Sequence, residues 1–360
     1  MIRKDPAQPG PVPGRAGPVI TIPRHPERIL SLAVSSNGQF LVTGAWDKIA
    51  RTWNLANGSL IRELKGHCGL INSVAISSDN RWIATGSHDT TARLWNAATG
   101  ELVREFKGHT QPVHSVSFSA DGQLLATASS DRTARIWAVA TGAAQTTLSH
   151  DAPVSSARFD PAGRRLVTAS WNNRATVWSL SAGKPTVTLD HQAQVNYAVF
   201  SPDGRRVVTA SEDGRAQVWE ENRPIGAALR HPGPVNHAAF SPDGRRVITA
   251  SDDSTARVWE ADTGAPISVP LPHNRQRVSA AVFAPDGLRV ITAGYDNEVR
   301  LWEVRYDWDD AALLADWVEA ESGYQAARLP DLVQLASPAT VRERIRNSAS
   351  PTAAFLRWCL

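Results

Sequence analysis

Residues 109–137 read HTQPVHSVSFSADGQLLATASSDRTARIW, a segment that begins with histidine and ends with tryptophan. The same pair recurs seven times along the 360 residues, and in six copies the two residues stand 28 positions apart. The tryptophans, spaced by 40 to 43 residues, are Trp53, Trp95, Trp137, Trp178, Trp219, Trp259 and Trp302. The histidines are His25, His67, His109, His150, His191, His231 and His273. A period of this length indicates one supersecondary unit copied in tandem.

Each copy divides into four short strand patterns separated by turn residues. In the copy quoted above, residues 113–118, 124–129, 133–137 and 145–148 are rich in residues that favour strands. The sequence Ser-Ala-Asp-Gly at 119–122 supplies the first turn. Four such strands make a small sheet with two apolar faces, which one copy cannot bury by itself. We therefore expect the copies to stack on one another.

Seven stacked sheets arranged radially predict an all-β fold, a seven-bladed β-propeller over residues 18–304. Residues 19–22 precede His25 just as a fourth strand precedes the histidine of the other copies, whereas the last copy has no clear fourth strand. We expect this N-terminal strand to complete the last blade. The Pro/Gly-rich residues 1–17 are predicted to be disordered. Residues 305–360 show helical periodicity and predict a short α-helical C-terminal tail.

The composition is that of an ordinary globular protein, with 42% apolar and 20% charged residues and a net charge of +3. Cys68 and Cys359 are the only cysteines, which favours a reducing compartment. The N-terminus lacks the apolar core of a secretory signal, and no run of about 18 apolar residues could span a bilayer. A cytoplasmic protein without a membrane segment is expected. No nucleotide-binding motif is present, so no cofactor is expected.

The repeated residues resemble the WD-repeat family of β-propellers over roughly residues 18–304, in a bacterial-type form. The pattern is His, then Ser-Pro-Asp-Gly, then Ser-x-Asp, then Trp. The clearest Ser-Pro-Asp-Gly turns are at 201–204 and 241–244. The resemblance implies that His, Ser, Asp and Trp of each blade form a buried hydrogen-bonded chain. Its complete members are His67, Ser87, Asp89 and Trp95; His109, Ser129, Asp131 and Trp137; His191, Ser211, Asp213 and Trp219; and His231, Ser251, Asp253 and Trp259.

Three blades depart from that pattern. Blade one has Ala45 where the serine belongs, blade four has Asn172 for the aspartate, and blade seven has Gly294 for the serine. We expect the hydrogen-bonded chain to be incomplete in these three blades. The tail looks like the helical extensions that follow WD repeats in large bacterial signalling proteins.

Repeated His, Asp and Ser residues invite comparison with a hydrolase, but a nucleophilic serine needs one base, one acid and one oxyanion site at a single place. A set that recurs in nearly every blade indicates a structural network instead, and no catalytic residue is predicted. Histidines about 41 residues apart lie in different blades, and no Cys/His cluster has metal-ligand spacing. No metal site is expected.

The positions that the repeat leaves free are the candidates for partner binding. Neighbouring blades seven, one and two bring aromatic residues and arginine to one sector, and these residue types are enriched at binding hot spots. The sector comprises Arg28, Leu30, Trp46, Leu70, His88, Arg277 and Tyr295. Another aromatic residue, Trp171, has no evident partners. The alternative is that these side chains only cap the inner strands. Leu30 belongs to a set of apparently free positions that also holds Asn72, His114, Ser155, Asn196, Asn236 and Ser279.

Arginines also recur after the first turn of blades four to seven: Arg164, Arg165, Arg205, Arg206, Arg245, Arg246 and Arg289. Stacked on one arc, they could attract an acidic partner or nucleic acid. No aromatic residues interleave with them for base stacking, so a solubilising role is favoured and nucleic acid is not the expected partner.

We therefore interpret the chain as a monomeric, non-enzymatic scaffold for protein–protein interaction that presents a rigid propeller face to a peptide or protein. The alternative is a sensor or regulatory module of a larger signalling protein, with the C-terminal helices docked on other domains.

Overall fold

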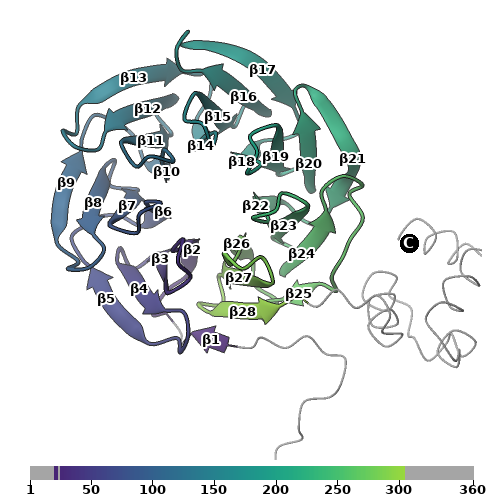
Figure 1. The fold of residues 1–360 in the computed structure, drawn as a ribbon, viewed down its shortest axis with the longest axis horizontal. Helices are drawn as coiled ribbons and strands as arrows, with labels where there is room; N and C mark the ends of the chain where they lie inside the picture. The colour runs from purple at the N-terminus through teal and green to yellow at the C-terminus, as the bar shows by residue number, and fades with distance from the viewer. Residues whose placement is uncertain (1–19, 23–24, 305–360) are drawn as a thin grey trace, which may run out of the picture.

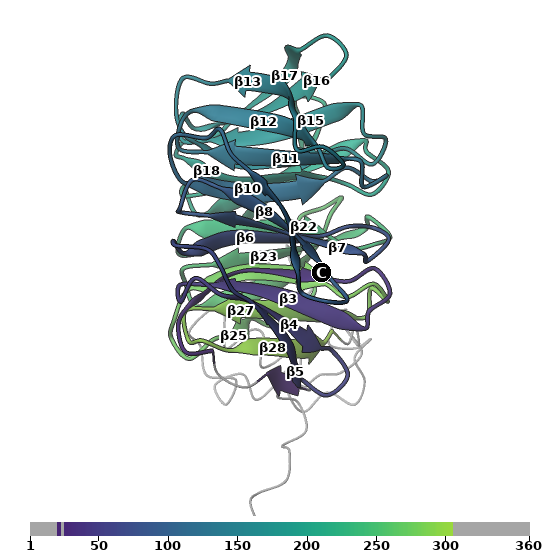
Figure 2. The ribbon, with the colours of Figure 1, turned by 90° about the vertical axis from the view of Figure 1, so that its left-hand side faces the viewer.

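The computed structural model describes residues 20–22 and 25–304. They form seven four-stranded antiparallel sheets arranged in a closed ring (Figure 1), which is the expected seven-bladed propeller. Seen from the side (Figure 2), the strands run from one face of the ring to the other, so the loops that join the strands form both faces. The segments 1–17 and 305–360, for which we predicted disorder and helices, lie outside the described residues.

The strands follow one another from the centre of the ring outward. Blades one to three comprise β2 (Ile29–Val34), β3 (Phe40–Ala45), β4 (Ala50–Asn54) and β5 (Leu60–Leu64); β6 (Ile71–Ile76), β7 (Trp82–Ser87), β8 (Ala92–Asn96) and β9 (Leu102–Phe106); and β10 (Val113–Phe118), β11 (Leu124–Ser129), β12 (Thr133–Ala138) and β13 (Ala144–Ser149). Blades four and five comprise β14 (Val154–Phe159), β15 (Arg165–Ser170), β16 (Arg174–Ser179) and β17 (Lys184–Asp190); and β18 (Val195–Phe200), β19 (Arg206–Ser211), β20 (Arg215–Glu220) and β21 (Arg223–Arg230). Blades six and seven comprise β22 (Val235–Phe240), β23 (Arg246–Ser251), β24 (Thr255–Glu260) and β25 (Leu271–Pro272); and β26 (Val278–Phe283), β27 (Arg289–Gly294), β28 (Val299–Glu303) and β1 (Ile20–Ile22).

The last blade contains both ends of the propeller. Strand β1 pairs antiparallel with β28, with Ile20 opposite Leu301 and Ile22 opposite Val299. In Figure 1 the purple β1 lies beside the yellow-green β28. The prediction that an N-terminal strand closes the ring is therefore confirmed. Ile22 is 3% exposed and belongs to a core cluster shared by blades seven and one.

The hydrophobic core lies between the blades. One cluster joins Val42 and Leu64 of blade one to Ile71, Ile83 and Trp95 of blade two, and clusters of the same kind occupy the other blade junctions. The second strand of every blade is buried except at its first residue. Burial on both faces explains why these strands read as continuous apolar and small residues, and it confirms the expected stacking.

Local backbone geometry explains the repeated turn residues. Gly122 adopts a φ of 68°, a conformation that glycine reaches without the penalty of a Cβ atom. In the same turn the Ser119 hydroxyl donates to Asp121 Oδ1 at 2.5 Å. The pairing of each innermost strand with its neighbour shifts register near the strand's second residue. This irregularity decides where the apparently free positions lie.

Candidate functional site

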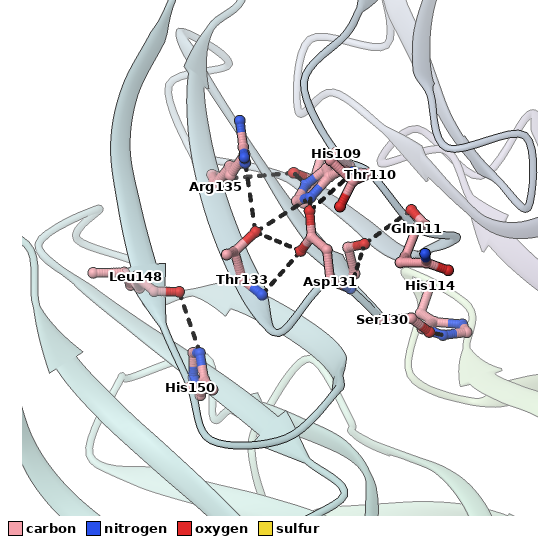
Figure 3. Close-up of polar contacts among 12 residues, drawn as sticks. His109, Thr110, Gln111, His114, Ser130, Asp131, Thr133, Arg135, Leu148 and His150 are labelled. Atoms are coloured by element: carbon pink, nitrogen blue, oxygen red, sulfur yellow. Dashed lines mark hydrogen bonds and ion pairs between the residues drawn. The ribbon is translucent and has the colours of Figure 1, made fainter.

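A buried chain of hydrogen bonds runs through blade three. The Trp137 indole donates from Nε1 to Thr127 Oγ1 at 2.9 Å, and His109 Nε2 lies 2.7 Å from the same oxygen. On its other side, His109 Nδ1 lies 2.7 Å from Asp131 Oδ2 (Figure 3). The second carboxylate oxygen of Asp131 accepts hydrogen bonds from the backbone N–H and hydroxyl of Thr133. The chain thus connects the third strand to two loops.

The linking hydroxyl belongs to a threonine, so the assignment of this role to Ser87, Ser129, Ser211 and Ser251 was wrong. Ser129 Oγ instead donates to Gln111 O and accepts from the Asp131 backbone N–H. Leu125 lies directly opposite Trp137, so Thr127 is the diagonal neighbour of the tryptophan, whereas Ser129 lies two residues farther along the strand, about 7 Å beyond Thr127. The other serines bond in the same way, to Gly69 O, Ala193 O and Gly233 O.

The same threonine position links histidine to tryptophan in all seven blades, through Thr43, Thr85, Thr127, Thr168, Thr209, Thr249 and Thr292. Blade seven is therefore complete despite Gly294, because His273 Nδ1 lies 3.0 Å from Asp296 Oδ1. The prediction that the hydrogen-bonded chain of blade seven is incomplete was therefore wrong.

Blades one and four do lack the contact between histidine and carboxylate. In blade one, Asp47 pairs with Arg51 at 2.7 Å, and His25 Nδ1 is buried without a hydrogen bond. In blade four, where Asn172 replaces the aspartate, His150 Nδ1 lies 3.2 Å from Leu148 O (Figure 3).

Burial sets the protonation of these chains. Burial lowers the pKa of His109, and it lowers the pKa of His25 to about 3 with a further contribution from the Arg51 charge. Burial alone would raise the pKa of Asp89, but hydrogen bonds from His67 and Thr91 hold it below its ordinary value. In blade three the pKa values of both His109 and Asp131 are lowered, so the chain pairs a neutral histidine with an ionised carboxylate at neutral pH. With its polar groups hydrogen-bonded in this way, the buried chain stabilises the arrangement of strands and loops within the blade.

Four of the seven sector residues form one cluster across blades seven and one. The Arg28 guanidinium lies 4.7 Å from the centroid of the Trp46 ring and 5.0 Å from that of Tyr295. The two rings lie 6.2 Å apart, in an edge-to-face arrangement. Arg277 lies 5.1 Å from the Tyr295 ring. We call Arg28, Trp46, Arg277 and Tyr295 the rim cluster.

Two features distinguish the rim cluster from the other loops of the ring. Trp46 is 37% exposed, which is unusual for the largest apolar side chain. Arg277 forms an ion pair with Asp252 at 2.6 Å, but Arg28 has no ion pair among the residues described. The cluster therefore presents an exposed ring beside a positive charge that cation–π contacts hold in place.

The remaining three sector residues lie elsewhere. Leu30 lines the central channel of the ring. Leu70 and His88 meet each other in blade two, where the His88 backbone N–H donates to Leu70 O at 2.9 Å. None of the contacts described among residues 25–304 joins Leu70 or His88 to the rim cluster.

The second residue of each innermost strand, which is Leu30 in blade one, is more constrained by structural contacts than the sequence suggests. In five blades its side chain donates to a backbone carbonyl of the next blade, as Asn72 does to Val113 O at 2.9 Å. The other four donors are Ser155, Asn196, Asn236 and Ser279. These residues tie the innermost strands together, and the repeat could have revealed them because all five carry short polar side chains.

A second exposed tryptophan has a partner that sequence reasoning missed. Trp171 is 39% exposed, and its ring lies 5.7 Å from that of His114 in the preceding blade. His114 Nε2 lies 2.6 Å from Ser130 Oγ (Figure 3). Burial lowers the pKa of His114 to about 4, so this pair lacks the positive charge of the rim cluster.

The arginines of the opposite arc divide into two groups. Arg206 donates to Gly244 O of the next blade at 2.7 Å and lies 5.6 Å from the Phe240 ring centroid, and Arg165 makes the equivalent contacts one blade earlier. These second arginines tie neighbouring blades together. The first arginines, Arg164, Arg205 and Arg245, have exposed side chains. Structural contacts therefore engage part of the charge that the sequence places on this arc.

The described residues were also compared with the requirements of a metal site and of a membrane-spanning helix. Residues 20–22 and 25–304 contain no group of three or more His, Cys, Asp or Glu side chains that could hold a metal ion. Those residues also include no helix long and apolar enough to cross a membrane. Cys68 is a free, exposed thiol.

Comparison with known proteins places the chain in a family. A family model described as "IFT122 first beta-propeller" matches residues 89–307, which is more than half of the chain. A second model, described as "WD domain, G-beta repeat", matches residues 16–54 and 58–96. A search of curated proteins gave no match. WD-repeat propellers are generally non-catalytic and typically bind proteins. The chain belongs to the family of the IFT122 first beta-propeller, and it is built from WD repeats.

Proposed function

We propose that this protein is a non-enzymatic interaction scaffold that docks a peptide or protein on the rim cluster. The observation that carries the proposal is the placement of the Arg28 guanidinium between the rings of Trp46 and Tyr295. Two aromatic contacts limit the motion of a long side chain before any partner arrives. Binding then loses less conformational entropy than it would with a mobile arginine.

The chemistry of the rim cluster favours a particular kind of partner segment. Arg28 has no ion pair among the described residues, and a guanidinium binds a carboxylate or phosphate through paired hydrogen bonds. The exposed Trp46 ring offers apolar area next to that charge. A segment with an acidic residue beside an apolar one fits both features. The match to the first propeller of IFT122 supports membership of a protein complex.

The experiment compares three forms of the protein as baits in quantitative affinity capture. The W46A/Y295A variant removes both rings, and the W171A variant removes a tryptophan of nearly equal exposure outside the rim cluster. We expect wild type and W171A to retain the same partner and W46A/Y295A to lose it, with all three baits equally folded by circular dichroism. Retention by all three baits would refute the rim cluster as the docking site.

A further inference from the structure

A central channel runs through the ring, with a volume of 550 Å³. The innermost strands of all seven blades line it: β2, β6, β10, β14, β18, β22 and β26 in Figure 1. Most lining side chains are small, apolar or neutral polar groups. The volume falls within the range of pockets that hold small molecules.

One arginine, Arg158 of β14, is among the residues that line this channel. No aspartate or glutamate is among them. The equivalent positions of the other six innermost strands hold Ala33, Ala75, Ser117, Val199, Ala239 and Val282. Blade packing therefore does not require an arginine here, since the fold accommodates a small or apolar side chain at every equivalent position.

The contacts of Arg158 leave its charge unpaired. Nη1 donates to Val116 O at 2.8 Å, and the guanidinium lies 5.0 Å from the centroid of the Tyr197 ring. Nε is buried and makes no hydrogen bond. Arg158 has no ion pair with any described residue. Partial removal of a guanidinium from water without an anionic partner is unfavourable.

The neighbouring blades extend the polar wall from Arg158. The Tyr197 ring of blade five lies 4.1 Å from the His237 ring of blade six, measured between centroids. His237 Nδ1 is buried without a hydrogen bond. Burial and the charge of Arg158 lower the pKa of His237 to about 3, so the imidazole is neutral. Three blades therefore bring an unpaired cation, a tyrosine and a histidine with an unsatisfied nitrogen to one side of the channel.

The nearest acidic side chains along the chain and at the rim are already engaged. Asp160, two residues after Arg158, forms an ion pair with Arg165 at 2.9 Å. Asp252 pairs with Arg277 of the rim cluster. Neither carboxylate lines the channel. No described carboxylate therefore balances the charge of Arg158, and a bound anion could do so.

We propose that the central channel binds a small organic anion, through a phosphate or carboxylate group seated on Arg158 beside Tyr197 and His237. A guanidinium in a partly desolvated cavity is well suited to either group, because charge-assisted hydrogen bonds strengthen as water is excluded. The volume leaves space for a metabolite larger than the anionic group itself. This site lies in the channel wall and does not depend on the rim cluster.

Isothermal titration calorimetry with inorganic phosphate and, separately, citrate tests this site. The R158M variant removes the channel charge, and R205M removes an exposed arginine in a turn of blade five, so both variants change the net charge equally. We expect wild type and R205M to bind at least one of the two anions and R158M to bind it at least tenfold more weakly. Preference for phosphate or for citrate identifies the anionic group.

The stability of R158M checks that its loss of binding does not reflect unfolding. Without added anion, R158M is expected to melt at or above the wild-type temperature, because the substitution removes an unpaired charge. If R158M does not fold, R158K and R205K replace the pair, and R158K is expected to bind several-fold more weakly than R205K. Equal binding by the channel and turn variants, or no binding of either anion by wild type, would overturn the proposal.

Discussion

Replacing Thr85 with valine tests the buried chain at its central link. Thr85 Oγ1 lies 2.9 Å from Trp95 Nε1 and 2.7 Å from His67 Nε2, and all three residues are buried. Valine keeps the shape of the side chain but leaves the indole N–H and the imidazole nitrogen without partners. Each unsatisfied buried group costs about 1–3 kcal/mol. The added methyl group recovers about 0.8 kcal/mol. We expect T85V to lower the free energy of unfolding by about 1–5 kcal/mol.

The matched comparison is Ser87→Ala, two residues along the same strand. Ser87 donates to Gly69 O at 3.0 Å and accepts from the Asp89 backbone N–H at 3.1 Å. Both partners lie in partly exposed loops, where water can replace the hydroxyl. S87A is therefore expected to cost only about 0.5–1.5 kcal/mol.

Urea unfolding followed by tryptophan fluorescence measures both variants. T85V should move the transition midpoint to clearly lower urea than S87A does, without a change in the slope of the transition. The corresponding pair in blade three, T127V and S129A, should give the same order. A larger loss for S87A than for T85V would refute the threonine-centred chain.

Two further predictions concern ring closure and acid stability. I22A removes a side chain that is buried between blades seven and one, and it should lower the free energy of unfolding in urea by about 2–4 kcal/mol. T21A, on the exposed face of the same strand, should change the free energy of unfolding little. Equal effects of the two variants would contradict the role of β1 in closure. The pKa of His25 is lowered from 6.5 to about 3 in the native state, so folding favours the neutral imidazole. The stabilisation from this preference is fully present above pH 6.5. It decreases by about 1.4 kcal/mol per pH unit as the pH falls toward 3. In urea titrations between pH 6.5 and 4, H25Q should therefore show a shallower loss of stability than wild type, and an unchanged slope would disprove the buried neutral imidazole.

The fold could be predicted because its main determinants repeat. Trp137 and His109 recur in phase with their turns, and that spacing predicts seven stacked sheets without knowledge of any contact. Ring closure could also be predicted, because the strand before His25 and the missing strand after Trp302 complement each other.

The details of the sites could be predicted only in part. Trp46 and Tyr295 occupy equivalent turns of adjacent blades, so their proximity follows from ring order. The choice between Thr127 and Ser129 depends on how far an indole reaches across two strands, which the motif does not specify. Arg158 escaped notice because it replaces a small or apolar residue on a strand and disturbs no repeated position. Only the closed ring shows that this strand faces a channel without carboxylates.

Photocrosslinking from position 46 tests docking at the rim cluster most directly. A benzophenone amino acid replaces Trp46 in one variant and Trp171 in the control, because the two tryptophans are 37% and 39% exposed. After irradiation in source lysate, mass spectrometry identifies the adducts. Docking at the rim cluster predicts one discrete protein adduct from position 46 that is absent from position 171 and is reduced when Arg28 is also changed to glutamate. Equal adducts from both positions, or an adduct only from position 171, would contradict it.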